Sequence, residues 1–312
     1  MSVNLTINGK KVNVPKGTTV LDAAKQAGIF IPTFCHDPEF PRFGACRICV
    51  VDIPGMRNLP ASCVTEVTEG MEVYTESPAV VEARKTILEL LLANHPKDCL
   101  TCERNGDCRL QDYAFQYGVK ESPFEGEKKN HPLDDSNPYI VRDPNKCILC
   151  GRCVSTCNAI PERSVIDFGY RGFNTKIVTG MDLPLAESDC VYCGRCVAVC
   201  PVGALTWKPL AGKGRVWEME KEEVTCTFCD SGCKFNLLKK QGKTIGVVPK
   251  STAVGRPLCL KGRLGLQLKY MDEPALPFIK KDGVFSQVSW AEALNIEEVL
   301  AKILKMNNSN EK

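Results

Sequence analysis

The chain has 312 residues and a formal net charge of +3, and 44% of its residues are hydrophobic. No stretch is apolar enough to span a bilayer. Lysines and arginines are scattered without the interleaved aromatics of a nucleic-acid stacking platform, so we expect no nucleic-acid partner. The N-terminus lacks the apolar core of a signal peptide, which predicts a cytoplasmic protein.

Cysteine usage is the unusual feature of the composition. The chain contains 19 cysteines, a share close to that of small disulfide-stapled secreted domains. In a reducing compartment, such a set of thiols binds metal more often than it forms disulfides. The spacing of the cysteines therefore carries the functional information, and it is best taken along the chain.

Residues 1–78 predict a small β-grasp domain. Two alternating segments, 3–7 and 11–14, flank Asn8-Gly9, a strong signal for a two-residue hairpin. Thr18 or Thr19 can cap the helix that follows, and Gly28 ends it. Two further strands are expected in the segments 46–53 and 71–76.

This domain contains the first candidate ligand set, which consists of Cys35, Cys46, Cys49 and Cys63. A lone cysteine, a C-x2-C pair and a remote fourth resemble the spacing of plant-type ferredoxins, although the first gap is longer here. We therefore expect a [2Fe–2S] site. The alternative is structural zinc, which usually takes two C-x2-4-C knuckles, whereas this set has only one.

Residues 79–118 predict a small helical domain. Ser77-Pro78 begins a helix, and His95-Pro96 ends it because the residue before proline avoids the α region. The polar, proline-containing segment 119–139 that follows the domain is expected to be a surface linker.

The second candidate set follows this helix and consists of His95, Cys99, Cys102 and Cys108. A neutral imidazole in place of a thiolate makes an iron–sulfur cluster less negative and changes its potential. The alternatives are that His95 is only a polar helix cap, or that His36, beside Cys35, is the histidine ligand. His131 lies in the linker without candidate partners. With His95, the nineteen cysteines make five sets of four.

Residues 140–208 contain an internal repeat. The runs CILCGRCVSTC and CVYCGRCVAVC both read C-x2-C-x2-C-x3-C, the pattern of bacterial two-cluster ferredoxins, in which the last cysteine of each run ligates the other cluster. Asn158 replaces the proline that normally follows the first run. The third set is therefore Cys147, Cys150, Cys153 and Cys200, and the fourth is Cys190, Cys193, Cys196 and Cys157.

Residues 219–270 contain the fifth set, which consists of Cys226, Cys229, Cys233 and Cys259. We expect a [4Fe–4S] cluster here too, although a turn with a remote fourth ligand also suits zinc. Residues 271–312 contain no cysteine, end in polar residues and are expected to be a C-terminal tail. The predicted fold class is thus α+β and multidomain, with one [2Fe–2S] and four [4Fe–4S] clusters.

The order of these motifs resembles that in the N-terminal part of the large iron–sulfur subunit of NADH:quinone oxidoreductase. It is also similar to the N-terminal modules of multi-cluster [FeFe] hydrogenases and of NAD-linked formate dehydrogenases. The block that ends in Cys259-Leu260-Lys261-Gly262-Arg263, with segment 275–294, resembles the start of molybdopterin oxidoreductases. In formate dehydrogenases the lysine matching Lys261 lies between cluster and pterin, which makes Lys261 a candidate cofactor-binding residue. Without a pterin it is a solvated lysine.

The resemblance implies an electron-transfer subunit of an NAD(P)H- and ferredoxin-linked oxidoreductase complex, with the electron-bifurcating transhydrogenase type favoured. The implied partners are an FMN- and NAD(H)-binding flavoprotein, a small thioredoxin-like [2Fe–2S] subunit, ferredoxin, and either a second flavoprotein or a separate catalytic subunit. No nucleotide-binding glycine motif and no catalytic domain follow, so we expect no substrate-converting site in these residues. The alternatives are a split formate dehydrogenase or hydrogenase, and a zinc-rich interaction protein.

Overall fold

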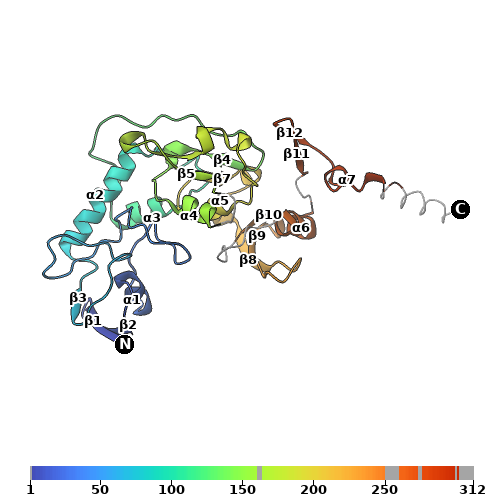
Figure 1. Ribbon diagram of the computed structural model, residues 1–312. Helices are drawn as coiled ribbons and strands as arrows, with labels where there is room; N and C mark the ends of the chain where they lie inside the picture. The colour runs from blue at the N-terminus through green and yellow to red at the C-terminus, as the bar shows by residue number, and fades with distance from the viewer. Residues whose placement is uncertain (1, 160–163, 250–259, 273–275, 299–300, 302–312) are drawn as a thin grey trace.

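The computed structural model describes residues 2–159, 164–249, 260–272, 276–298 and 301. Short strands and helices alternate along four consecutive cysteine-bearing regions, which confirms the predicted α+β class (Figure 1). Helix α2 (Pro78–Asn94) leads from the N-terminal region to a central region that begins at residue 140, and the region of residues 220–249 lies beyond it (Figure 1). Helix α7 (Trp290–Ala293) lies away from the rest (Figure 1).

The N-terminal region is a three-stranded sheet covered by one helix. Its elements are β1 (Ser2–Ile7), β2 (Lys10–Pro15), α1 (Val20–Gln26) and β3 (Met71–Val73). β1 pairs antiparallel with β2 and parallel with β3, in the order β2-β1-β3. Asn8 and Gly9 take φ angles of 50° and 78°, as a tight hairpin turn requires. Thr19 caps α1 and Gly28 follows its end, so the expected hairpin, helix and closing strand are confirmed.

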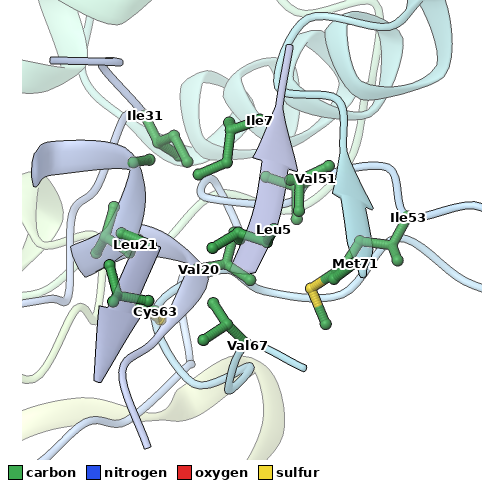
Figure 2. Close-up of a cluster of buried hydrophobic side chains, with 14 of the residues drawn as sticks. Leu5, Ile7, Val20, Leu21, Ile31, Val51, Ile53, Cys63, Val67 and Met71 are labelled. Carbon is green, nitrogen blue, oxygen red and sulfur yellow. The ribbon is translucent and has the colours of Figure 1, made fainter. Parts of the chain in front are cut away.

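The core of this region fills the space between α1 and the sheet (Figure 2). Leu5 and Ile7 alternate with the exposed Asn4 and the half-buried Thr6 along β1, and α1 contributes Val20 and Leu21. The same core contains Cys63, which is 1% exposed. The loop that bears the predicted ligands is therefore packed into the hydrophobic core of the domain.

The prediction of a strand over residues 46–53 is wrong. The structure has only single bridges here, between Val50 and Ala61 and between Asp52 and Tyr74. Arg47 takes a left-handed φ of 57°, which interrupts any extended run. The segment is a loop around Cys46 and Cys49 instead, because its backbone is bent toward the sulfurs.

Helices α2 (Pro78–Asn94) and α3 (Arg109–Gln116) form the second region. Ser77 caps α2 and His95 ends it, as predicted. The fully buried Arg84 of α2 donates hydrogen bonds to the Tyr117 hydroxyl at 2.7 Å and to the carbonyl of Val50 at 2.9 Å. Val50 follows Cys49, so this guanidinium joins the N-terminal loop to the helix that leads to His95.

Segment 119–139 contains no helix or strand, but it packs on the central region. Asp134 bridges Arg142 through backbone pairing and through a salt bridge of 2.9 Å. The backbone N–H of Lys129 donates to the side chain of Asn94 at the end of α2. This segment is therefore attached to its neighbours along its length.

The central region contains two small antiparallel pairs and two short helices. They are β4 (Ile140–Arg142) with β7 (Leu205–Trp207), β5 (Ile166–Gly169) with β6 (Lys176–Thr179), α4 (Arg152–Asn158) and α5 (Arg195–Val199). Each helix begins inside one cysteine run, and the two helices pack against each other.

The last regions are a three-stranded sheet with a helix, followed by a hairpin. Their elements are β8 (Glu220–Thr225), β9 (Lys234–Lys240), β10 (Lys243–Pro249), α6 (Leu260–Tyr270), β11 (Phe278–Lys281), β12 (Val284–Gln287) and α7 (Trp290–Ala293). The segment expected to be a tail thus carries secondary structure. Its hairpin packs Phe278 on Tyr139 and Phe285 on Tyr192, with ring centroids 6.0 and 5.6 Å apart.

The buried face of β1 allows a prediction about the free energy of unfolding. Ile7→Ala should destabilise the N-terminal region by about 2–5 kcal/mol, because it leaves a cavity in a filled core. Lys11→Ala, on an exposed position of β2, is the matched control and should change little. The check is thermal unfolding followed by the visible absorption of the N-terminal site. Equal effects of the two variants would contradict the described core.

Candidate metal centres

The four cysteines of the first set lie in the irregular chain between α1 and β3. Cys35, Cys49 and Cys63 are buried, and Cys46 is half-buried. Cys46 and Cys63 donate hydrogen bonds to Cys35 and lower the pKa of that thiol to about 2. The same contacts raise the pKa of both donors.

Contact with Cys63 also lowers the pKa of the Cys49 thiol to about 6. The contacts thus form two pairs, Cys35 with Cys46 and Cys49 with Cys63, joined through Cys35 and Cys63. A [2Fe–2S] cluster takes two ligands at each iron. The donor set and its pairing therefore fit that group.

The second set surrounds the junction between α2 and α3. Its members are the C-cap His95, Cys99, Cys102 and the N-cap Cys108. Cys108 is buried, Cys102 is half-buried and Cys99 is exposed. Burial raises the pKa of the Cys108 thiol, and Cys102 is one of the groups near it.

The three histidines differ in their neighbours. Lys146 lies close to both His95 and Cys102, which places this imidazole beside the second set. Burial lowers the pKa of His95, so the ring is held neutral at pH 7, the form that binds metal. The rival, His36, lies beside Cys35 and Asp37 instead. His131 lies near Lys129 and Lys176, away from both sets.

The second set touches the central region at Gly203. A Cβ atom on this residue would lie 2.7 Å from the Cys102 sulfur, closer than real side chains approach. The Arg104 side chain donates to the carbonyl of Cys200 at 3.0 Å, and the N–H of Arg109 donates to the carbonyl of Pro201 at 2.9 Å. Backbone atoms of residues 200–203 therefore lie against both the second and the third set.

The internal repeat adopts the same local geometry twice. The N–H of Leu149 donates to the Cys147 sulfur and the N–H of Tyr192 donates to the Cys190 sulfur, both at 3.4 Å. Both donors have left-handed φ angles, 54° and 51°. N–H groups directed at sulfur are a feature of iron–sulfur sites and tune their potentials.

The last cysteine of each run lies near cysteines of the other run. Burial raises the pKa of Cys153 well above its usual range, and the thiols around it add to this effect: Cys147, Cys150, Cys200 and Cys196. Burial likewise raises the pKa of Cys196, whose surrounding thiols are Cys193, Cys190, Cys157 and Cys200. Each group thus contains the remote cysteine of the other run, with Cys153 and Cys196 between them.

All four cysteines of the third set line one cavity, whose other walls are largely apolar, with Ile166, Ile177 and Leu185 among them. Among the described residues, no three His, Cys, Asp or Glu side chains converge tightly enough to hold a single metal ion. Sulfurs spread around a cavity suit a cage of iron and sulfide rather than one zinc, which needs thiolates at about 2.3 Å.

Three cysteines of the fifth set, Cys226, Cys229 and Cys233, lie on the turn between β8 and β9. Cys226 is buried, Cys229 is exposed, and the Cys226 N–H donates to the Cys233 carbonyl at 2.8 Å. Cys259 lies outside the described residues. The first turn of α6 approaches the same place, since a Cβ on Gly262 would lie 3.4 Å from the Cys226 sulfur. The backbone of Lys261 is in that turn, and its side chain lies outside the description.

Arg84, Arg152 and Gly203 are site residues that the sequence analysis missed. In the sequence, Arg84 cannot be distinguished from an ordinary cation on a helix, because its buried contacts are with segments that are far apart in the chain. Arg152, whose side chain forms an ion pair with Asp37, two residues after Cys35, had one available signal, because Cys-Gly-Arg-Cys occurs in both runs. Gly203 had none, since only the fold brings it to Cys102.

No helix in the described parts of the chain is long and apolar enough to cross a bilayer. The four cysteine-bearing regions, each with sulfurs gathered in a loop or cavity, define a multi-cluster iron–sulfur protein. Comparison with known proteins then identifies its kind.

Four family models match consecutive parts of the chain. They are the 2Fe-2S iron-sulfur cluster binding domain over residues 1–78, the NADH-ubiquinone oxidoreductase-G iron-sulfur binding region over 84–123, the 4Fe-4S dicluster domain over 146–204, and the molybdopterin oxidoreductase Fe4S4 domain over 219–271. The predicted order of domain types is therefore confirmed.

Two similar proteins show the same relationship. The chain is 38% identical over 296 residues to a G-type subunit of the NADH-quinone oxidoreductase of Rhizobium meliloti, covering 93% of the chain and 34% of that protein. It is 39% identical over 273 residues to the HndD subunit of the NADP-reducing hydrogenase of Solidesulfovibrio fructosivorans, covering 84% of the chain and 45% of that protein. The chain thus spans less than half the length of these relatives.

A solved structure agrees with them. A chain of an NAD+-reducing [NiFe]-hydrogenase in the H2-reduced state superposes with a TM-score of 0.65 at 33% identity, covering 69% of this chain and 92% of that one. The protein belongs to the family of iron–sulfur subunits that includes the G-type subunits of NADH-quinone oxidoreductase and the related hydrogenase subunits, which confirms the resemblance in its sequence.

The contact at Gly203 predicts a selective lesion. Gly203→Ala should weaken the binding of a cluster at the second set, because the added methyl group displaces the Cys102 sulfur. The readout is loss or change of one [4Fe–4S] EPR signal while the others persist. Gly126→Ala is the matched control, since open space surrounds that Cβ position. Unchanged spectra in both variants would contradict the described packing.

The two candidate histidines give a second test. His95→Ala should lower the iron content from about eighteen to about fourteen atoms per chain by removing one [4Fe–4S] cluster. His36→Ala should leave the iron content at its full value. The check is iron analysis together with EPR of the reduced protein. The assignment fails if the two histidines exchange these outcomes.

Proposed function

We propose that this chain is an electron-transfer subunit whose twenty ligands hold one [2Fe–2S] and four [4Fe–4S] clusters. Such clusters, when bound, accept and release single electrons. The protein contributes the spacing, the burial and the local charge. The ligands are the five sets given above, with His95 as the one nitrogen donor and Cys259 completing the fifth set.

The observation that carries this proposal is the continuity of one hydrophobic cluster. Buried or partly buried cysteines of the first four sets share it, including Cys35, Cys108, Cys150 and Cys190. Apolar side chains such as Phe34 and Ile48 fill the space between the sets and exclude water. Separate zinc sites do not need a common apolar interior. Electron transfer between clusters, in contrast, requires that neighbouring clusters lie close together.

The fifth set continues the array. Arg195, fully buried at the start of α5, lies near Cys193 and Cys157 of the fourth set and near Cys233 of the fifth. The sets therefore adjoin from the N-terminal loop to the turn between β8 and β9. Cys99 and Cys229, in the second and fifth sets, are the exposed cysteines among the described residues.

The names of the relatives support a nicotinamide cofactor at one end of the electron path. They include an NADH-quinone oxidoreductase, an NADP-reducing hydrogenase and an NADPH-Fe(3+) oxidoreductase of Geobacter sulfurreducens. We propose a flavoprotein that binds FMN and NAD(H) as the donor subunit, with a small [2Fe–2S] subunit beside it and ferredoxin as a redox partner. A second flavoprotein would make the complex an electron-bifurcating transhydrogenase in the cytoplasm.

The alternative is a formate dehydrogenase or hydrogenase whose catalytic domain is another chain. The match over residues 219–271 to a molybdopterin oxidoreductase domain favours the formate case, as does the position of Lys261 directly after the fifth set. In that case Lys261 links the fifth cluster to a pterin.

A purified native complex tests the proposal. We expect about eighteen irons per chain, no stoichiometric zinc, and bleaching of the visible absorption by NADH or NADPH. Formate- or hydrogen-dependent bleaching, with molybdenum or tungsten present in the formate case, would select the alternative. A colourless zinc protein would refute both electron-transfer proposals.

A further inference from the structure

The loop that carries Cys99 and Cys102 has little internal structure to hold it. It connects α2 to α3 and contains neither a helix nor a strand. Cys99 is exposed and Leu100 is 83% exposed, so few apolar contacts fix this part of the chain. Its internal backbone hydrogen bonds link residues three or four apart, such as the N–H of Cys102 and the carbonyl of Asp98. A cluster held here therefore depends on contacts from outside the loop.

Arg215 supplies two such contacts. Its guanidinium group donates to the carbonyl of Leu100 at 2.5 Å and to the carbonyl of Cys102 at 3.1 Å. These partners lie 115 and 113 residues away in the sequence, and Arg215 itself precedes β8. A guanidinium group presents its donors in one rigid plane, whereas a lysine offers a single flexible point charge. One side chain thus holds two carbonyls of the segment that contains the C-x2-C pair.

The chain on either side of this arginine contacts the same loop. The ring of Trp217 lies against Gly106 so closely that a Cβ atom on this glycine would be 2.9 Å from the ring. The N–H of Gly212 donates to the Glu103 carboxylate at 3.3 Å. Residues 212–218, here called the strap, are therefore attached to the loop at three places.

The strap is in turn held by the sheet β8–β10. The N–H of Arg215 donates to the Glu218 carboxylate at 2.8 Å, and the ammonium group of Lys240, at the end of β9, contacts the same oxygen at 2.9 Å. The Lys240 side chain also packs on Gly214, whose Cβ position would lie 3.1 Å from it. β9 begins directly after Cys233. A continuous series of polar contacts thus connects the sheet of the fifth set to the loop of the second.

We propose that Arg215 is a positioning residue for the second set, which fixes the Cys99–Cys102 loop through two carbonyls and is itself aligned by Glu218. The inference rests on the proposed function, because it requires a cluster at the second set. Two carbonyls held by one rigid fork restrict the rotation of the backbone between them, so the two sulfurs keep the separation that a cluster needs. The second set then depends on how the sheet of the fifth is seated.

The test compares variants of the complete chain with its clusters. Arg215→Met removes both hydrogen bonds and keeps a long side chain. It should change the line shape of one [4Fe–4S] EPR signal, the signal that His95→Ala abolishes. It should also speed the release of that cluster's iron to a chelator about tenfold, the size expected from a lost hydrogen bond to a charged group. The other signals and release rates should match those of the unmodified protein.

Further variants separate orientation from charge. Arg215→Lys keeps the charge and loses the fork, so it should restore only part of the slow release. Glu218→Gln leaves Arg215 in place and weakens its alignment, so it should change the same signal by a smaller amount. Lys213→Met is the matched control, because it removes a positive charge from an exposed side chain two residues away, and it should change neither readout.

The inference is overturned if Arg215→Met leaves the second signal and its release rate unchanged, or if Lys213→Met has the same effect. Full rescue by Arg215→Lys also overturns it, since charge alone would then suffice. If Arg215→Met fails to incorporate clusters, Glu218→Gln decides in its place, and an unchanged second signal counts against the inference. These results leave the electron-transfer proposal intact, whereas a second signal missing from the unmodified protein overturns both.

Discussion

The burial of sulfur in apolar surroundings is the interaction on which the structure depends. A thiolate loses its hydration inside a protein, so buried cysteines stay protonated or require a metal partner. Burial raises the pKa of Cys153 and Cys196, and sulfurs of four sets share one hydrophobic cluster. These regions contain few long elements, so the clusters that we propose at the cysteines would supply cohesion that regular secondary structure does not.

The fold that surrounds these sulfurs is shaped by close approach. Positive φ angles recur at Arg47, Leu149 and Tyr192, each next to or within two residues of a predicted ligand. Such conformations cost energy for ordinary side chains. They are maintained here because they direct backbone N–H groups at sulfur, as at Cys147 and Cys190. Local strain at the ligand loops is thus part of how the sites are formed.

Much of this arrangement could be predicted from the sequence, because its signals are local. Asn8-Gly9, the caps of α1 and α2 and the spacing of each cysteine run are short-range patterns. The strand prediction for segment 46–53 is wrong because its apolar residues are typical of a strand, whereas the chain bends around its predicted ligands. Contacts between sets could not be predicted, since Arg152 meets Asp37 and Gly203 meets Cys102 only after folding.

The family relationship adds information about function that the geometry alone does not give. The chain matches 34% and 45% of the length of two relatives that are themselves subunits of larger enzymes. The adjoining sets therefore have a role only in combination with donors and acceptors that lie outside them. In the proposed electron-transfer role, the specificity of such a protein lies in the surfaces around its exposed cysteines.

The C-terminal hairpin has a consequence for survival in air. β11 and β12 place Phe285 on Tyr192 and Phe278 on Tyr139, directly beside the N–H contact to Cys190. Sulfide cages decay when dioxygen or peroxide reaches them. The hairpin rings pack edge to face on Tyr139 and Tyr192, so they cover the residue whose N–H donates to Cys190 and would limit the access of oxidants to a cluster held there.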